Sequence, residues 1–323
     1  MKPFARSRPA AVALSFTALV LGAVGFLPLF DGPGYESALA AGLVVPSAVA
    51  ITTALELRSP RAAPIDALAR GLSYGVLFTF VVWLLVMAHG LRVGFCDPWR
   101  GTLLFVLGPL VGAMLAGAWG AFAGEIAGRL RRKNAQRVAA VLLAIAAPLG
   151  SALVSLVRFY TSPMVFAYDP FVGFFSGTLY DTIIDPVGLS SYRAGSVATL
   201  LGLTILSLHL GRDAMDRIVF RSPQRPGLTL LGVASFAASF VSMAQGYRSG
   251  HWHTSSTIAE QLGARLSGER CDVIYSRGLP LEAVQLFASD CDAYVIEQEA
   301  WFETKGPARI TAYLFADSVQ KRR

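Results

Sequence analysis

The sequence predicts an all-α polytopic membrane bundle of about seven transmembrane helices, followed by a small C-terminal α/β domain. Hydrophobic residues make up 54% of the 323 residues and charged residues only 15%, and the mean hydropathy is +0.52. A soluble domain of this length needs less apolar surface to fill its core. The excess apolar surface therefore has to face lipid.

Seven apolar runs are long enough to cross a bilayer, whose core of roughly 30 Å needs about twenty residues in a helix. Charged residues are confined to the ends of these runs, which are residues 10–30, 36–57, 71–91, 102–127, 136–157, 195–211 and 227–246. After Gln245, charged residues return to the density of a soluble protein. We therefore divide the chain into a transmembrane domain, residues 1–246, and a C-terminal domain, residues 247–323.

The connecting loops alternate in basic content, and cytoplasmic loops are the ones that carry excess Lys and Arg. Loops on one side contain Lys2, Arg6, Arg8, Arg58, Arg61, Arg70, Arg129, Arg131, Arg132, Lys133, Arg137, Arg212, Arg217, Arg221 and Arg225. Loops on the other side contain Arg92, Arg100, Arg158 and Arg193. We expect a protein integral to the cell (inner) membrane, with a cytoplasmic N-terminus and an extracytoplasmic C-terminal domain. The lipid bilayer is then its principal partner.

The first apolar run also has features of a signal peptide. Lys2, Arg6 and Arg8 precede it, and Ala38-Leu39-Ala40 resembles a small-residue cleavage site. Its length exceeds that of a typical signal core, which favours a retained anchor, and cleavage would leave the remaining topology unchanged.

Several function classes lack the residues that they need. Ion-coupled transport requires ionisable groups at membrane depth, whereas Glu36, Glu56, Glu125, His89 and His209 fall near span ends, where they reach the interface or pair with Arg. A transporter or channel is therefore disfavoured. Nucleic-acid binding is not expected, since no zinc-finger spacing or aromatic-and-basic surface is present. Nucleophile-elbow and phosphate-cradling glycine motifs are absent as well.

Glycines are concentrated in the fourth run, at Gly108, Gly112, Gly117, Gly120, Gly124 and Gly128. The last three repeat at four-residue spacing, which places them on one helical face where another backbone can approach closely. We expect this face to pack inside the bundle; a dimerisation face or a hinge is the alternative.

The outer loop of residues 158–193 is aromatic, weakly charged and interrupted by prolines. Such a segment suits the outer membrane interface or a re-entrant element that caps the bundle. Asp169, Asp181 and Asp185 are candidate oxygen ligands for a hard cation if they converge. Asp also begins turns and caps helices, which is the competing interpretation for Asp169 and Asp185.

The C-terminal domain reads as a short helix over residues 255–266, capped by Ser255 or Ser256, and then as strand, helix and strand. The strands are residues 271–275 and 309–315, and the helix between them is residues 281–303. In an oxidising compartment Cys271 and Cys291 form either a disulfide or two buried thiols. Cys96, in an outer loop, has no obvious partner.

This strand-helix-strand pattern, with Tyr-Leu-Phe-Ala-Asp-Ser at residues 313–318, resembles the opening of the gluzincin domains called peptidase MA-like. The resemblance covers about residues 270–323 and implies a zinc helix with His-Glu-x-x-His further along the chain. No His follows His253, so the zinc ligands and the catalytic glutamate of that family are absent here. We therefore assign no catalytic, cofactor or metal residue to this chain. We also expect it to be the front part of a longer protein, which would supply any zinc site.

Two functions remain. The first is a multi-pass membrane protein that anchors an extracytoplasmic (periplasmic) zinc-metalloprotease-like domain, catalytically incompetent with these residues. The second is a non-enzymatic membrane protein whose outer domain binds a protein partner or an envelope component.

Overall fold

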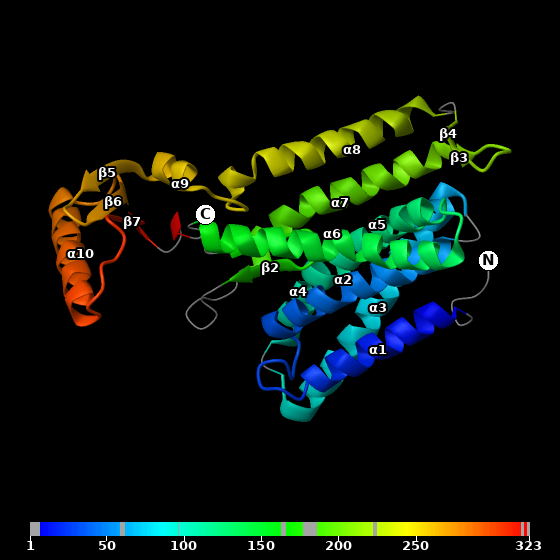
Figure 1. Ribbon diagram of the computed structural model, residues 1–323, viewed down its shortest axis with the longest axis horizontal. Helices are drawn as coiled ribbons and strands as arrows, with labels where there is room; N and C mark the ends of the chain where they lie inside the picture. The colour runs from blue at the N-terminus through cyan, green and yellow to red at the C-terminus, as the bar shows by residue number, and fades with distance from the viewer. Residues whose placement is uncertain are drawn as a thin grey trace. The chain divides into compact units, whose positions relative to one another are not determined.

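The computed structural model describes residues 7–58, 62–95, 97–162, 166–176, 186–221, 225–317 and 320–321. The chain forms two compact units, which we describe separately (Figure 1). The helical unit comprises Met1–Phe159 and Phe166–Gly246, and the C-terminal unit comprises Tyr160–Val165 and Tyr247–Arg323.

Five helices of the described chain are long and apolar enough to cross a membrane. They are α2 (Tyr35–Leu57), α3 (Pro64–Val93), the continuous helix of α4 (Pro98–Phe105), η2 (Val106–Leu110) and α5 (Val111–Ala127), α6 (Lys133–Thr161) and α8 (Pro226–Ala244). Two more helices coincide with the first and sixth predicted runs. Of these, α1 (Arg8–Val24) has 17 residues, and α7 (Pro186–Leu208) begins well before residue 195.

Helix α2 forms the centre of the helical unit, packed mainly against α5 and α3. Its residues Ala41, Val45, Val49, Ala50 and Ala54 are 0% exposed. These side chains are small, so the neighbouring helices can approach α2 closely. The apolar side chains of α2 are therefore buried against other helices. In contrast, α6 and α8 expose most of their apolar side chains.

The glycines of α5 allow close helix packing inside the unit, as predicted. A Cβ added at Gly117 would overlap the backbone of Gly71 on α3. On another side of α5, Gly120 lies against the backbone of Ala50 on α2, and Gly124 against that of Ala54. The expectation of packing within the bundle is therefore confirmed.

The chain between α6 and α7 contains a short hairpin, which packs into the helical unit. Strand β1 (Phe166–Asp169) pairs antiparallel with β2 (Gly173–Ser176), and the turn between them lies against α2 and α5. A Cβ at Gly42 would overlap the carbonyl of Val172, and a Cβ at Gly112 that of Phe171. The hairpin turn therefore packs into the helical unit, and the two predictions for the place of the outer loop in the membrane stay predictions. A second hairpin, β3 (Leu210–Arg212) and β4 (Ile218–Phe220), joins α7 to α8.

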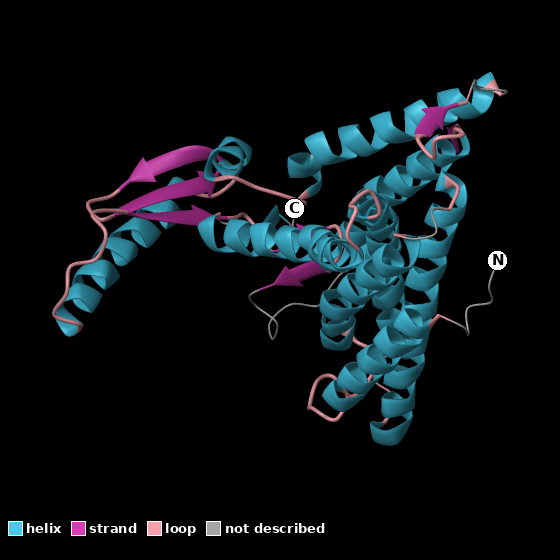
Figure 2. Cartoon of the chain, turned by 45° about the vertical axis from the view of Figure 1, so that its right-hand side comes forward, coloured by secondary structure: helices cyan, strands magenta, loops and turns pink. Residues whose placement is uncertain are grey.

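The C-terminal unit contains a three-stranded sheet (Figure 2). After η3 (Gly246–Ser249) and α9 (Ser255–Leu262) come β5 (Gly263–Ser267), β6 (Cys271–Ser276), α10 (Leu281–Trp301) and β7 (Ile310–Leu314). The strand order is β5-β6-β7, with β5 antiparallel and β7 parallel to β6. Helix α10 is therefore the crossover of a strand-helix-strand unit.

The helix predicted over residues 255–266 is shorter than expected. Gly263 adopts φ +79°, a left-handed conformation that ends α9 at Leu262, and the chain continues as β5. The cap is Thr254, whose hydroxyl accepts the backbone N–H of Thr257. The sequence interpretation therefore missed one strand and placed the cap one or two residues late.

Alternate strand residues build a core on each face of the sheet. Val273 of β6 packs with Val284 and Ala288 of α10, whereas Ile274 packs with Ile258 and Leu262 of α9. This alternation is the expected period of a strand covered by a helix on both faces.

Candidate functional site

Asp169 lies at the end of β1 and is 0% exposed. One carboxylate oxygen accepts the backbone N–H groups of Phe171 and Val172, at 2.8 Å each. The other accepts the hydroxyls of Ser151 and Ser155 on α6, at 2.5 and 3.0 Å. Four donors occupy both oxygens, so Asp169 closes the hairpin turn, in agreement with the competing interpretation of this residue.

The other two candidates for a cation site, Asp181 and Asp185, lie outside the described residues, as does Cys96. Within the described ranges, no three His, Cys, Asp or Glu side chains gather as a metal-ligand set. The proposed convergence of three aspartates therefore stays a prediction.

Arg193 is the main correction to the sequence interpretation. It was assigned to an outer loop, but the structure places it inside α7 with 2% exposure. Its guanidinium donates to the carbonyls of Leu107, Gly108 and Pro170. Two of these acceptors belong to the π-helical turn η2, and the third follows Asp169 in the hairpin. Arg193 therefore joins three separate segments of the helical unit.

Together, Asp169 and Arg193 hold the hairpin turn from two sides. Arg193 is positive and Asp169 is negative, and each charge attracts the other without an ion-pair contact. The two charges therefore cancel in this buried site. The cavity beside the turn has a volume of only about 10 Å³ and is lined mainly by apolar residues, among them Leu104, Val172 and Leu189. A space of that size holds at most one water molecule. The arrangement fixes the hairpin rather than binding a substrate.

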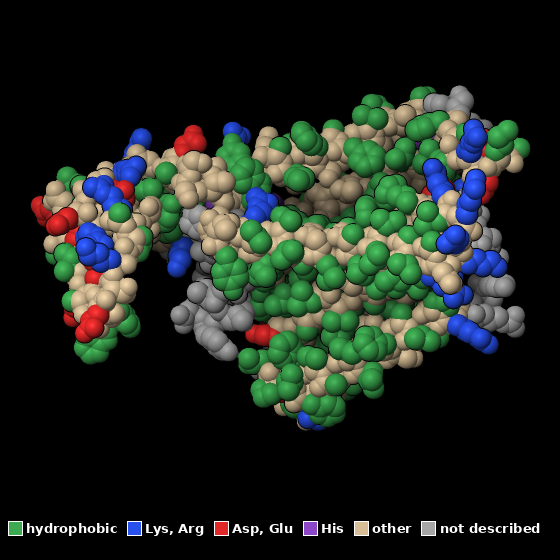
Figure 3. Space-filling view, in the orientation of Figure 1, with side chains coloured by type: hydrophobic (Ala, Val, Ile, Leu, Met, Phe, Trp, Pro, Cys, Tyr) green, Lys and Arg blue, Asp and Glu red, His purple; other side chains and the backbone are tan. Residues whose placement is uncertain are grey.

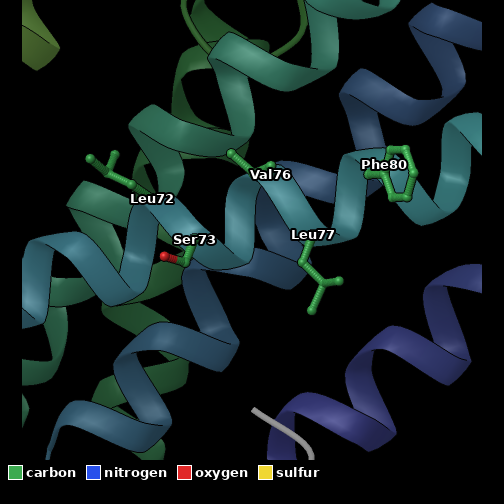
Figure 4. Close-up of a pocket in the computed structure, with 5 residues that line it drawn as sticks. All are labelled: Leu72, Ser73, Val76, Leu77 and Phe80. Carbon is green, nitrogen blue, oxygen red and sulfur yellow. The ribbon is translucent and has the colours of Figure 1, made fainter. Parts of the chain in front are cut away.

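The larger depression, of about 400 Å³, lies on the outer face of α3 (Figure 4). All of its lining residues come from that one helix: Leu72, Ser73, Val76, Leu77 and Phe80. The Ser73 hydroxyl donates to the carbonyl of Ala69 in its own helix. Because the lining is almost wholly apolar and lacks convergent polar groups, the depression suits a lipid chain better than a polar ligand.

Two of the carboxylates near the span ends, Glu56 and Glu125, lie near basic residues, as expected. Glu125 accepts Arg212 at 2.6 Å and Arg129 at 3.4 Å. Glu56 accepts the hydroxyl of Tyr74 at 2.5 Å and lies 4.0 Å from Arg70. The expected pairing of Glu56 and Glu125 with arginine is therefore confirmed, and their place at the membrane boundary stays a prediction.

The C-terminal unit joins the start of β6 to α10 by two contacts close together. A disulfide links Cys271 to Cys291, with 6.1 Å between their Cα atoms. Next to it, the carboxylate of Asp292 accepts the backbone N–H groups of Glu269, Arg270 and Cys271 at 2.7–2.8 Å. Burial by itself would raise the pKa of Asp292, but these N–H donors outweigh it and lower the pKa.

Ion pairs extend this attachment along α10 and across the sheet. Arg270 donates to both carboxylate oxygens of Glu299, which lowers the pKa of Glu299 and raises that of Arg270. On the sheet, Asp272 pairs with Arg265 at 2.7 Å and Arg309 at 3.1 Å. A hydrogen bond from Ser267, followed by one from Arg265, lowers the pKa of Asp272. The orientation of α10 is therefore set by covalent, polar and apolar contacts together.

Sequence reasoning identified Asp169, Cys271 and Cys291 as notable but missed Arg193 and Asp292. A signal for Arg193 was present, since it follows Pro186 in a segment without other charges that leads directly into an apolar run. Asp292 gave no such signal, because its partners are backbone groups 21 and 22 residues away in sequence. Comparison of the chain with protein-family models, with curated proteins and with solved structures found no match.

Proposed function

We propose that this protein is a seven-span membrane anchor that holds its C-terminal unit on the extracytoplasmic side of the cell membrane. We further propose that this unit belongs to a peptidase MA-like module. In this proposal the chain's own residues supply the framework of the module and no zinc site.

The charge distribution supports the proposed orientation. Lys and Arg side chains gather at the end of the helical unit where β3 and β4 lie, whereas hydrophobic side chains cover its length (Figure 3). This is the distribution of a bundle whose basic end faces the cytoplasm. Helices α1 and α7 supply the two spans beyond the five that are long and apolar enough by themselves.

The disulfide is the observation that carries the proposal. Disulfides persist in oxidising compartments outside the cytoplasm, so the link between Cys271 and Cys291 favours an extracytoplasmic C-terminal unit. Seven spans starting from a cytoplasmic N-terminus place that unit on the same side. Two unrelated features, one in each unit, therefore support one topology.

The module assignment rests on the strand-helix-strand unit of β6, α10 and β7 and on the residues that follow it. Strand β7 lies parallel to β6 after a helical crossover, as in the predicted pattern. The disulfide and Asp292 hold the crossover helix firmly against the sheet. Such a unit is a stable base for a domain that extends beyond it.

A second candidate function, binding of a partner or an envelope component, is favoured by the outer surface of α10. Leu286, Tyr294, Trp301 and Phe302 are exposed on and just after this helix. Exposed apolar groups of this kind mark contact surfaces. In this alternative the C-terminal unit acts by binding and has no peptidase activity.

Reporter fusions at residues 132 and 250 test the topology. Alkaline phosphatase should be inactive at residue 132 and active at residue 250, and a green fluorescent protein fusion should give the opposite pattern. If the reporters at residues 132 and 250 lie in the same compartment, the seven-span topology is refuted.

The coding region beyond Arg323 separates the two candidate functions. A downstream His-Glu-x-x-His followed by a glutamate, together with zinc in the purified full-length protein, supports the peptidase module. A stop codon directly after Arg323 supports the binding function instead.

A further inference from the structure

The connection between α5 and α6 and the first turns of α6, residues 129–137 together, carry Arg129, Arg131, Arg132, Lys133 and Arg137. The shape of this turn is fixed by Gln136, whose side-chain amide donates to the carbonyls of Leu130 at 2.7 Å and Gly128 at 3.4 Å. The basic side chains extend from the fixed turn into solvent. We call these residues the basic turn.

Most of the basic turn has no acidic partner in the part of the chain that the structure describes. Elsewhere at this end of the helical unit, Arg70 lies near Glu56, and Arg212 pairs with Glu125 and Asp216. In the basic turn only Arg129 approaches a carboxylate, Glu125. Arg131, Arg132, Lys133 and Arg137 form no ion pair within the described ranges, so their charges are available to an external anion.

A further positive charge lies beside the turn. Arg58, which follows α2, packs near Gly128 and close enough to Arg137 for the two charges to repel each other. Like charges at such a distance are unfavourable unless an anion lies between or above them. Within the described ranges no carboxylate forms an ion pair with either arginine.

The helix that leaves the basic turn is apolar on its outer face. Val138, Leu142, Leu149 and Leu153 of α6 are more than half exposed. A positive cluster at the end of an exposed apolar helix face matches a phospholipid, since headgroup phosphate and acyl chains are joined in the same order. A soluble anion would account for the charges but not for the apolar face above them.

We propose that the basic turn and the outer face of α6 form a binding site for anionic phospholipid, with Arg131, Arg132, Lys133 and Arg137 contacting the headgroup phosphate. This inference rests on the proposed function, because it requires the basic end of the bundle to lie at the cytoplasmic membrane surface. Bound lipid then covers α6, which has few buried residues and makes few protein contacts.

The test compares the full chain in nanodiscs of phosphatidylcholine with the full chain in nanodiscs that also contain phosphatidylglycerol. Native mass spectrometry after detergent extraction measures retained phosphatidylglycerol, and thermal unfolding measures stabilisation. Wild type should retain phosphatidylglycerol selectively and unfold at a higher temperature in its presence. The triple variant R131Q/R132Q/R137Q should retain it about tenfold to a hundredfold less, because three charges near the headgroups are lost.

The matched control is R217Q/R221Q/R225Q, which removes three arginines from the loop between α7 and α8 on the same predicted side. It should retain phosphatidylglycerol to within about twofold of wild type after detergent extraction, since these arginines lie outside the basic turn and contact no lipid held on α6. Equal losses in both variants, or no lipid preference in wild type, would overturn the inference. Inorganic phosphate added to phosphatidylcholine nanodiscs should not stabilise the protein; the same stabilisation as with phosphatidylglycerol would assign the turn to a free anion instead.

The reporter fusion at residue 250 separates this failure from failure of the proposed function. A membrane-inserted variant with an extracytoplasmic residue 250 and unchanged lipid retention refutes the lipid site only. A wild-type protein that is not inserted, or that is inserted in the opposite orientation, refutes the anchor itself.

Discussion

At the scale of single residues, the helical unit contains an arginine that is fully enclosed by protein and bonded to carbonyl oxygens. Arg193 is 2% exposed, and its three acceptors come from η2 and from the hairpin turn. The negative charge of Asp169 acts on it as well, although the Asp169 carboxylate is itself occupied by four hydrogen-bond donors. Loss of either charge would leave the other uncompensated in a medium of low dielectric constant.

Arg193→Met should therefore destabilise the protein by about 3–5 kcal/mol, because three buried carbonyl oxygens lose their donor and Asp169 loses a compensating charge. The double variant D169N/R193M should lose less than the sum of the single variants, because no uncompensated charge remains. Thermal unfolding in detergent micelles measures both effects. Arg100→Met, at an exposed arginine, is the control, and equal stability of R193M and R100M would contradict the assignment.

At the scale of elements, contacts between helices depend on positions that lack a side chain. The backbones of α5 and α3 meet at Gly117 and Gly71, where each glycine faces the carbonyl of the other. Between membrane helices, packing of this kind replaces the hydrophobic driving force that water supplies elsewhere.

Gly117→Ala should force α5 and α3 apart and lower the free energy of unfolding by about 1–3 kcal/mol. Gly150→Ala on α6 is the matched control, because a Cβ there meets nothing within 4 Å. That change should be neutral or stabilising, since alanine favours helix over glycine. Thermal unfolding of both variants decides the matter, and a G117A protein as stable as G150A would show that the two helices can separate without cost.

The attachment of α10 to the sheet depends on carboxylates whose pKa values are lowered in the folded unit. A carboxyl with a lowered folded pKa stabilises the fold above its unfolded pKa and loses this contribution as pH falls through the folded value. Asp272, Asp292 and Glu299 all belong to this class. The C-terminal unit should therefore be insensitive to pH near neutrality and lose stability from about pH 4 downward.

Hydrogen exchange in α10 of the full-length protein, corrected for the intrinsic effect of pH, measures this loss. Glu299→Gln should weaken the hydrogen-exchange protection of α10 near neutral pH, because the ion pair with Arg270 is lost. The protection should also fall less on acidification, since this carboxylate no longer titrates. Glu297→Gln, at an exposed position on the same helix, should follow wild type. If the protection of α10 falls equally with pH in E299Q and wild type, Glu299 does not contribute to the loss of stability in acid.

Elements defined by composition could be predicted from sequence, and elements defined by a single backbone angle could not. The apolar runs that became α2, α3 and α6 are recognisable because length and hydropathy decide them. Strand β5 was missed because Ile258, Leu262 and Leu266 continue a helical spacing across Gly263, whose left-handed φ ends the helix. Arg193 was misplaced because the helix was expected to begin at residue 195, whereas α7 begins at Pro186, and its carbonyl partners lie in distant segments.

At the scale of the whole molecule, the two units place different chemical requirements on their surroundings. The helical unit needs a lipid environment for the exposed apolar faces of α6 and α8. The C-terminal unit needs an oxidising environment for the bond between Cys271 and Cys291. A single chain meets both requirements if it spans the cell membrane with its C-terminus outside.

Cysteine labelling of intact cells tests this combination. A membrane-impermeant maleimide should label Cys96, which the predicted topology places outside. A C96S variant should remain unlabelled until a reducing agent frees the thiol of Cys291, which is partly exposed, whereas Cys271 is 0% exposed. Labelling of C96S without reductant would show that the disulfide is absent in cells. Labelling of C96S only after the cells are opened would place the C-terminal unit in the cytoplasm.

The hairpin of β1 and β2 also constrains how the chain assembles during synthesis. Ser151 and Ser155 are made before Asp169, so its carboxylate can be satisfied as soon as the turn emerges beside α6. The carbonyl of Pro170 gains its hydrogen-bond donor only later, when Arg193 is synthesised as part of α7. A nascent chain stopped before α7 therefore has the hairpin turn bonded to α6 through Asp169 but lacks the contact from Arg193. The bundle is complete only after α7 has been inserted.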